Sequence, residues 1–491
     1  MRAKILVFGM IGLLLILLPG GIREARADIP LWGDKLTLTG FLRYELAVHT
    51  AQKNPNNFYQ TDNNDFNFSR TYFQTEWTYK PSNIFKLYAK VKLMGDQTRE
   101  MDDALGSYKA FPVDVPRYDW MMMKGSTNQF RAEVNELYAD LNFGDLWLRL
   151  GKQQIAWGEM LATRILDVIN PLDMSRNLLF ELEEFENIRI PEWSIRGRYQ
   201  FGKVGPVDEF MLEGFVNPRD VQPTQYADFG SPFYLGTGNE SFPPFFRLKD
   251  KDRRGDTEFG FRMGGMLKSF YFTLNYLRLY SDEFLLEFTG SRLNPMSPIG
   301  VDLLFDKKYP LTNIFGLTAN YCNAPTNTVA TFEGAWIPDQ PYQDAWAYSH
   351  GDSKIHDQGT WNYAIRFDRQ TFVFPRPTSA MMITFQYSQT VREGDNDRIL
   401  GANNSKVDKT DDFITLKLDQ NFYHDTYVAT LLFVYDTDDA SYFKPSFKYR
   451  HGDRWYIDLY TVYLAGKEKR PGRFGGLDWV NETVVRFTYQ F

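Results

Sequence analysis

The chain has 491 residues and a net charge of −7, from 55 Lys and Arg against 62 Asp and Glu, a balance that excludes a typical nucleic-acid-binding protein. Cys322 is the single cysteine, so the sequence excludes intrachain disulfides and thiolate metal clusters. The 5 His are scattered, and we expect no metal site and no other cofactor. The mean hydropathy of −0.42 is polar, yet 16% of the residues are aromatic.

Residues 1–27 have the pattern of a secretory signal peptide. A positively charged start precedes an apolar run over residues 5–18, which is too short for a comfortable membrane span. The tripeptide Ala-Arg-Ala that follows provides a small-residue cleavage site. We therefore expect cleavage before Asp28 and export of residues 28–491 as one domain. An uncleaved N-terminal anchor is the alternative.

The exported part contains many segments in which apolar and polar residues alternate, bounded by turn residues. Alternation places the two kinds of side chain on opposite faces of a β-strand. The predicted strands are 36–48, 66–79, 84–94, 132–143, 146–156, 192–202, 209–217, 256–268, 270–281, 311–322, 328–337, 360–368, 378–391, 411–418, 426–436, 441–450, 454–466 and 480–491.

The connections between these strands alternate in length. Long connections follow the odd-numbered strands and short ones follow the even-numbered strands, except for the short link at 437–440. Short periplasmic turns that alternate with long extracellular loops, with both termini on one side, are typical of outer-membrane barrels. The sequence therefore predicts an all-β, transmembrane antiparallel β-barrel of about 18 strands, within a range of about 16–20, in the outer membrane of a Gram-negative bacterium.

The last strand supports this interpretation. Phe487, Tyr489 and Phe491 alternate with polar residues, so they form an apolar outer face. A terminal Phe with aromatic residues two and four positions earlier also resembles the signal that the barrel-assembly machinery reads. A secreted β-rich carbohydrate-binding protein would share the aromatic content but has less need of this ending.

If the apolar faces contact lipid, the opposite faces line the lumen, which is too wide in an 18-stranded barrel for wall side chains to fill. Basic residues outnumber acidic ones on these predicted inner faces. Basic side chains around an aqueous constriction favour anions; mixed charges in salt-bridged ladders are the alternative. The predicted lumen and selectivity residues are Arg43, Arg70, Lys90, Arg149, Arg196, Arg198, Arg262 and Arg366, and the same reasoning places Lys92 and Arg486 on inner faces.

The long connection at residues 157–191 contains the most informative motif. Its Asn-Pro-x-Asp piece is a turn signal, and we expect the connection to fold into the lumen. The residues of this predicted constriction-loop motif are Trp157, Glu159, Asn170 and Asp173. Three nearby carboxylates, Glu183, Glu184 and Glu186, raise the option of acid–base chemistry, but a solvated or salt-bridged constriction loop is the preferred interpretation.

The stretch "GKQQIAWGE…INPLD", followed by an Ile-Pro-x-Trp sequence at the start of a strand, resembles a broad family of proteobacterial outer-membrane barrels of unknown function. In length and loop plan the chain is also similar to the 18-stranded alginate-export porins, whose lumen is rich in Arg and Lys. The resemblance implies an outer-membrane channel and does not indicate a substrate.

Two functions follow from these patterns. The preferred one is a channel for diffusion or export of polar, anionic solutes, small or polymeric, with membrane lipid and the assembly machinery as its other partners. The alternative is a sheath that encloses a periplasmic or outer-membrane partner, such as a multihaem cytochrome; any haem would be the partner's, because the chain has no Cys-x-x-Cys-His. An enzyme is not predicted, because Gly-x-Ser-x-Gly and His-Glu-x-x-His are both missing from the sequence.

Overall fold

The structure is a computed structural model of the whole chain. It describes residues 29–50, 66–98, 117–127, 129–176, 185–218, 221–227, 233, 246–250, 257–282, 284–297, 299–344, 355–373, 379–400, 407–437, 440–466 and 477–491. The predicted signal peptide and its cleavage site, Glu183 and Glu184 lie outside these residues. None of the helices in these ranges has the length and apolarity that a membrane-crossing helix needs.

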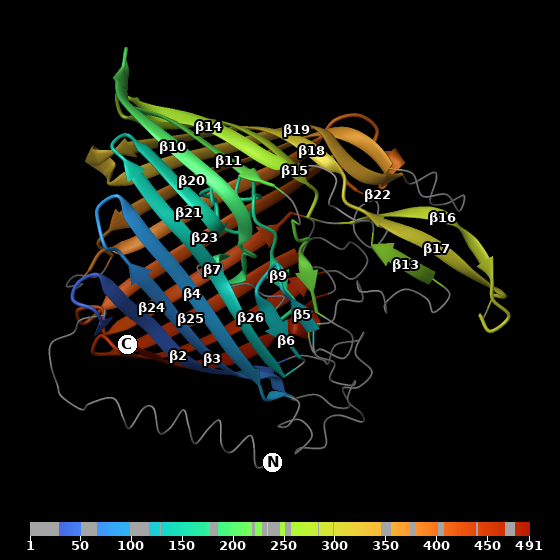
Figure 1. Cartoon of the computed structure of the whole chain (residues 1–491), viewed down its shortest axis with the longest axis horizontal. Coiled ribbons are helices and arrows are strands. Elements are labelled where there is room, and N and C mark those ends of the chain that lie inside the picture. The colour runs from blue at the N-terminus through green and yellow to red at the C-terminus, as the bar shows by residue number, and fades with distance from the viewer. Residues whose placement is uncertain are drawn as a thin grey trace.

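The described residues form a closed, antiparallel, 18-stranded β-barrel, which confirms the predicted fold class (Figure 1). The strands of the wall are β2 (Leu36–His49), β3 (Phe66–Tyr79), β4 (Phe85–Asp96), β7 (Phe130–Phe143), β8 (Leu146–Gln153), β10 (Glu192–Val204), β11 (Val207–Asn217), β14 (Glu258–Leu267), β15 (Phe270–Tyr280), β18 (Leu311–Asn323), β19 (Thr328–Asp344), β20 (Ile355–Thr371), β21 (Met381–Arg392), β23 (Thr410–Phe422), β24 (Tyr427–Asp436), β25 (Ala440–His451), β26 (Trp455–Gly466) and β27 (Glu482–Gln490).

The two ends of the chain close the barrel. β27 pairs antiparallel with β2, from Phe41 opposite Gln490 to His49 opposite Glu482. Beyond the strand, the backbone N–H of Phe491 donates to the carbonyl of Gly40 over 2.9 Å. A closed ladder leaves no free strand edge, which is what a sheet needs in lipid, where no water can satisfy backbone groups.

Alternation along the strands separates an outer apolar face from an inner polar face over much of the wall. On β10, Ile195 and Tyr199 are exposed on the outside, and Arg196 lies between them on the inner face. On β14, Phe261 is exposed outside and the adjacent Arg262 points inward to a buried carboxylate. The outer belt of exposed apolar side chains is the surface that contacts lipid in a transmembrane barrel.

Shorter elements lie outside the wall strands, most of them in the long connections, which sequence periodicity did not resolve. They are β1 (Ile29–Pro30), β5 (Arg117–Asp119), β6 (Lys124–Ser126), β9 (Asp173–Met174), α3 (Phe185–Ile188), β12 (Gln225–Tyr226), β13 (Phe246–Asp250), β16 (Leu285–Leu293), β17 (Val301–Lys308), β22 (Ile399–Leu400), η1 (Ala324–Thr326), η2 (Asn396–Arg398) and η4 (Asp478–Val480). β13, β16 and β17 form a separate sheet that projects beyond the wall at the right of Figure 1.

One side of the inner wall departs from the expected polar lining. Leu432 and Val434 on β24 are 0% and 1% exposed. Their neighbour Leu431 points to the outer face and is 44% exposed. The inward pair packs in an apolar cluster with Leu172 and Met174, which come from the connection between β8 and β10. Both faces of the wall are therefore apolar here, because protein rather than water covers the inner one.

Candidate functional site

The connection between β8 and β10, residues 154–191, is called the inward segment below. Hydrogen bonds join its described residues to inner faces of strands far apart around the wall. Trp157 Nε1 donates to Glu213 on β11 over 2.9 Å, and the N–H of Leu161 donates to Gln386 on β21 over 2.9 Å. Because these strands stand on different sides of a closed barrel, the segment reaches across the lumen.

Glu333 on β19 fixes the middle of the inward segment. Its side chain is 0% exposed, and its two carboxylate oxygens accept the backbone N–H groups of Glu159 over 2.8 Å and Leu166 over 2.7 Å. Gly316 on β18 leaves the space that Leu166 fills, since a Cβ there would collide with the Leu166 side chain. Glu333 thus provides the hydrogen-bond acceptor for this part of the segment, and Gly316 provides the space into which it packs.

Asn170, from the predicted motif, ties the two ends of the inward segment together. Its side-chain oxygen accepts the N–H of Ile155 over 2.7 Å, and its amide nitrogen donates to the carbonyl of Ile190 over 2.9 Å. The residue is 1% exposed, so both bonds are shielded from water. A buried side chain that satisfies two backbone groups stabilises this conformation, because each group would otherwise lose its water partner.

Asp173, the last residue of the motif, anchors the segment ionically. Its carboxylate lies 2.5 Å from Arg131 Nη1 on β7 and 3.7 Å from Lys124 Nζ on β6. Burial opposes ionisation of Asp173, but the two cations outweigh it and hold the pKa of that carboxyl well below its usual range. Asp173 therefore remains charged and draws basic side chains into the lumen.

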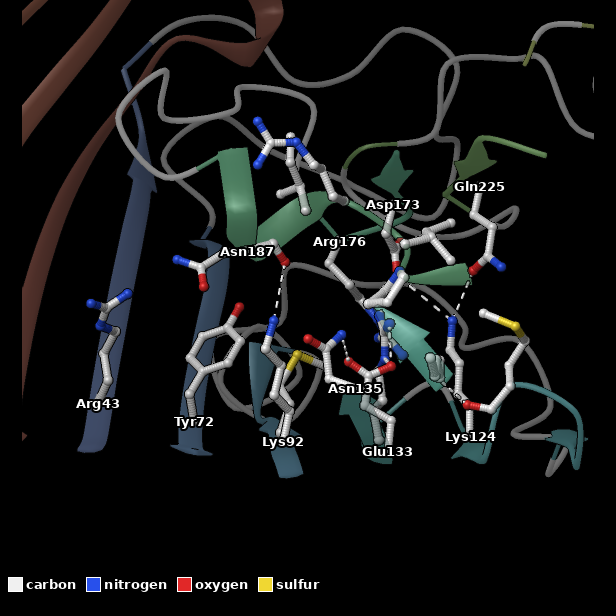
Figure 2. A pocket seen from close by; sticks show the side chains of 18 of the residues that line it. Arg43, Tyr72, Lys92, Lys124, Glu133, Asn135, Asp173, Arg176, Asn187 and Gln225 are labelled. Carbon is white, nitrogen blue, oxygen red and sulfur yellow. Dashed lines mark hydrogen bonds and ion pairs between the residues drawn. The ribbon is translucent and has the colours of Figure 1, made fainter. Parts of the chain in front are cut away.

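A pocket of about 170 Å³ lies between the inward segment and the inner faces of β2, β3, β4 and β7 (Figure 2). Eight cationic side chains and three carboxylates of the described residues line it. The cations are Arg43, Lys92, Lys124, Arg131, Lys152, Arg176, Arg189 and Arg486; the carboxylates are Glu45, Glu133 and Asp173. The surplus of positive charge is notable in a chain with fewer basic than acidic residues.

Two of the lysines meet neutral oxygens rather than carboxylates within the described part of the chain. Lys92 Nζ lies 3.5 Å from the carbonyl of Asn187, as Figure 2 shows. Lys152 Nζ donates to the carbonyls of Met122 over 2.5 Å and Val134 over 2.9 Å. A carbonyl satisfies a hydrogen bond but does not neutralise the charge, so both ammonium groups add to the positive potential of the pocket.

Lys124 also lies in the positive potential of the pocket. Its Nζ donates to Gln225 Oε1 over 2.8 Å and faces Asp173 (Figure 2). Burial lowers the pKa of Lys124, and the positive charges of Arg131 and Arg176 lower it further, beyond what the nearby carboxylates restore. An anion in the pocket would relieve this repulsion.

The predicted lumen residues are mostly held by carboxylates. Of the eight predicted selectivity residues, Arg43 lines the pocket, 3.7 Å from Glu45. Lys92 and Arg486, which the same alternation places on inner faces, line it too. The other selectivity residues pair as follows: Arg70 with Asp96 at 2.7 Å, Lys90 with Glu136 at 3.1 Å, Arg149 with Asp140 at 2.6 Å, Arg196 and Arg262 with Glu213 at 2.7 and 3.0 Å, and Arg366 with Asp368 at 2.7 Å. Arg198 lies 5.6 Å from the ring of Trp147. These pairs match the salt-bridged ladder that was the alternative interpretation.

The other predicted residues lie apart from the pocket. Glu159 accepts a hydrogen bond from Asn320 over 3.1 Å, on the far side of the inward segment. Phe487 is exposed on the outer face, and the rings of Tyr489 and Phe491 are 6.4 Å apart at the end of the barrel. Their recognition by the assembly machinery stays a prediction.

Sequence reasoning missed Lys152 for a physical reason. Simple alternation along β8 places it with the lipid-facing leucines Leu146, Leu148 and Leu150. Gly151 adopts a φ of 134°, in a place where a Cβ would collide with the backbone of β7, and this breaks the alternation. Lys124, Arg131, Arg176 and Arg189 lie in or beside the long connections, where no periodicity assigns a face. The "GKQ" sequence was the one available signal, since a Gly inside a strand pattern suggests a bulge.

Within the described residues, no group of three or more His, Cys, Asp and Glu could hold a metal ion. The described residues form a transmembrane β-barrel whose lumen is crossed by its own chain and keeps a basic pocket on one side. The chain belongs to the family DUF1302, a protein family of unknown function, which matches residues 7–399.

No curated protein matches the chain. Three solved structures are similar over most of their length: Acinetobacter baumannii OccAB3 (10% identity, 93% of this chain and 99% of that chain, TM-score 0.48), Salmonella typhi OmpF in complex with daunomycin (12%, 94% and 100%, 0.42) and the trimer form of Vibrio cholerae OmpT (11%, 93% and 99%, 0.39).

Proposed function

We propose that the protein is an outer-membrane channel through which polar, anionic solutes diffuse. The observation that carries this proposal is the charge of the pocket: eight cationic side chains against three carboxylates in the described residues. Basic groups around an aqueous constriction lower the free energy of an anion there and raise that of a cation. The wall supports the proposal, because a barrel of about 18 strands is too wide to be filled by its own side chains.

The inward segment determines where solutes pass. It packs against the apolar inner wall formed by β24, β25 and β26, and it is hydrogen-bonded to β11, β19 and β21. The pocket lies on the remaining side, beside β2, β3, β4 and β7. In the proposed channel, every solute that follows this side passes Lys92 and the cations around it.

The sheath function is not adopted. A sheath needs an interior large enough for a partner protein, and here the inward segment reaches from β8 to β21 and occupies the middle of the barrel. No described contact favours a second function over the channel.

The proposal is tested by the ratio of chloride to potassium permeability in planar bilayers. Lys92→Glu reverses one charge in the pocket, and we expect the ratio to fall several-fold. Lys203→Glu is the matched control, because Lys203 lies near the end of β10 with its side chain 70% exposed and does not line the pocket. The proposal is wrong if the unmodified protein prefers potassium, or if the control lowers the ratio as much as Lys92→Glu does.

A further inference from the structure

The basic pocket also has an apolar side. Met94, Met122 and Ile190 line it and are 5%, 4% and 6% exposed, and Ile188 and Pro191 extend the same surface. Inorganic anions and hydrated polar solutes gain nothing from such a surface. The apolar residues therefore bear on which anions the pocket accepts, a property that the charges alone do not set.

Each apolar side chain is held next to a cation. Met94 follows Lys92 by two residues on β4, so both share the inner face of the strand. Met122 lies in the turn between β5 and β6, where its N–H donates to Asp119 over 2.9 Å and its carbonyl accepts Lys152. One solute can therefore contact a cationic group and an apolar side chain at the same time.

The third apolar residue comes from the inward segment. The N–H of Ile190 donates to the carbonyl of Pro171 over 2.8 Å, and its own carbonyl accepts the Asn170 amide. Its neighbour Arg189 is fixed by Asp167 at 2.6 Å. These backbone bonds are internal to the segment and fix the position of Ile190 at the pocket.

We propose that the pocket binds organic carboxylates that carry a compact apolar group, with the carboxylate at Lys92 and the apolar group against Met94, Met122 and Ile190. The inference rests on the proposed channel function and names its substrate class. Transfer of apolar solute surface from water to apolar side chains is favourable in proportion to the area buried. The two methionines are flexible, so the pocket accepts a class of apolar groups rather than one shape.

The test is block of the chloride current by a series of straight-chain carboxylates: acetate, propionate, butyrate and pentanoate. With the full chain in planar bilayers, the half-blocking concentration is measured for each. We expect it to fall about fourfold for each added methylene, the value for complete burial of one CH₂ group. Butyramide, which has the apolar group without the charge, is expected to block at least ten times more weakly than butyrate.

Two variants separate the apolar contribution from the charge. Met94→Gln keeps the side-chain length and replaces the apolar thioether end with a polar amide, and we expect it to flatten the dependence on chain length. Lys92→Gln should weaken the block by all four carboxylates by a similar factor and leave that dependence unchanged. Met296→Gln is the control for the Met replacement, because Met296 is 92% exposed between β16 and β17, away from the pocket.

The possible outcomes separate this inference from the proposed function. If acetate and pentanoate block equally in an anion-selective channel, the pocket is purely ionic and the inference is wrong while the channel function stands. The inference also fails if Met94→Gln keeps the full dependence on chain length. If the protein does not prefer anions, isothermal titration of the detergent-solubilised chain still measures the carboxylate series, and a fourfold gain per methylene would support the pocket without the channel.

Discussion

The two sides of the lumen are built from different chemistry. On the side of β23 to β26, inward residues such as Leu432, Val462 and Leu464 are apolar and at most 2% exposed, because they pack against the inward segment or its neighbours. On the side of β2 to β8, many inward residues are charged, and several of them line a pocket together with Met94. The comparison shows that the inner face is apolar where the inward segment packs closely against it and charged where the segment leaves a pocket.

The same comparison assigns separate tasks to the two sides. Burial of a Leu or Val side chain stabilises a fold by about 1.5–3 kcal/mol, so the apolar side supplies most of the hold on the inward segment. The ion pairs of the charged side are largely buried, as for Arg486 and Glu45 with side chains 7% and 8% exposed. A buried pair adds little net stability, because the cost of removing both charges from water offsets their attraction. The charges on this side can therefore act on a solute.

The largest effect is expected from loss of apolar packing. Leu432→Ala should lower the free energy of unfolding by about 2–5 kcal/mol, because it removes a fully buried side chain from the inner cluster. Leu431→Ala, one residue away on the outer face, should cost much less. Thermal unfolding of both variants, followed by circular dichroism, checks the difference. Equal losses would show that the inner apolar wall does not hold the segment.

The next effect concerns the middle of the inward segment, which joins the two sides. Glu333→Ala leaves two buried backbone N–H groups without their acceptor, at a cost of about 1–3 kcal/mol each. We expect a less stable protein and larger fluctuations of the open-channel current. Glu333→Gln keeps one oxygen as acceptor. Its stability and its current fluctuations should lie between those of the unmodified protein and those of Glu333→Ala. Recordings from Glu333→Ala as quiet as those of the unmodified protein would contradict this role.

A smaller, pH-dependent effect is expected on the charged side. The pKa of Asp173 in the folded protein lies below the usual 3.8, so its stabilising contribution is present above pH 3.8 and shrinks as the pH falls below it. Asp173→Asn should therefore lower the melting temperature at pH 7, by an amount that corresponds to about 1.5–3 kcal/mol for a charged hydrogen bond. The gap should begin to narrow below pH 3.8 but should persist at pH 3, because the contribution is lost only as the pH reaches the much lower pKa of the folded state. A gap that has already vanished at pH 3 would show that the folded protein does not hold the pKa of Asp173 well below its usual range.

The barrel could be predicted from the sequence because lipid imposes a periodicity of two on nearly every strand. β3, for example, begins and ends at the predicted residues Phe66 and Tyr79. Where a strand end differs from the predicted one, the difference has a physical cause. β8 ends at Gln153 rather than at residue 156, since the chain turns inward there, and β19 runs on to Asp344, beyond the predicted residue 337, where it also pairs with β22.

The pocket was much harder to predict. Its residues come from wall strands, a hairpin turn and the inward segment, and no local pattern records that Lys124 and Asp173 meet. The motif that contains Asn170 was recognised, but its role in tying Ile155 to Ile190 depends on the path of the whole segment. Sequence alternation assigns a residue to a face; it does not show which charges on that face have partners.

The central claim is that the charged side of the lumen selects anions, and the reversal potential of the unmodified protein under a tenfold gradient of potassium chloride tests it most directly. The account predicts a steady conductance and a reversal potential displaced toward the equilibrium potential of chloride. A displacement toward the equilibrium potential of potassium would contradict it, because the basic pocket would then not lie on the route of the ions.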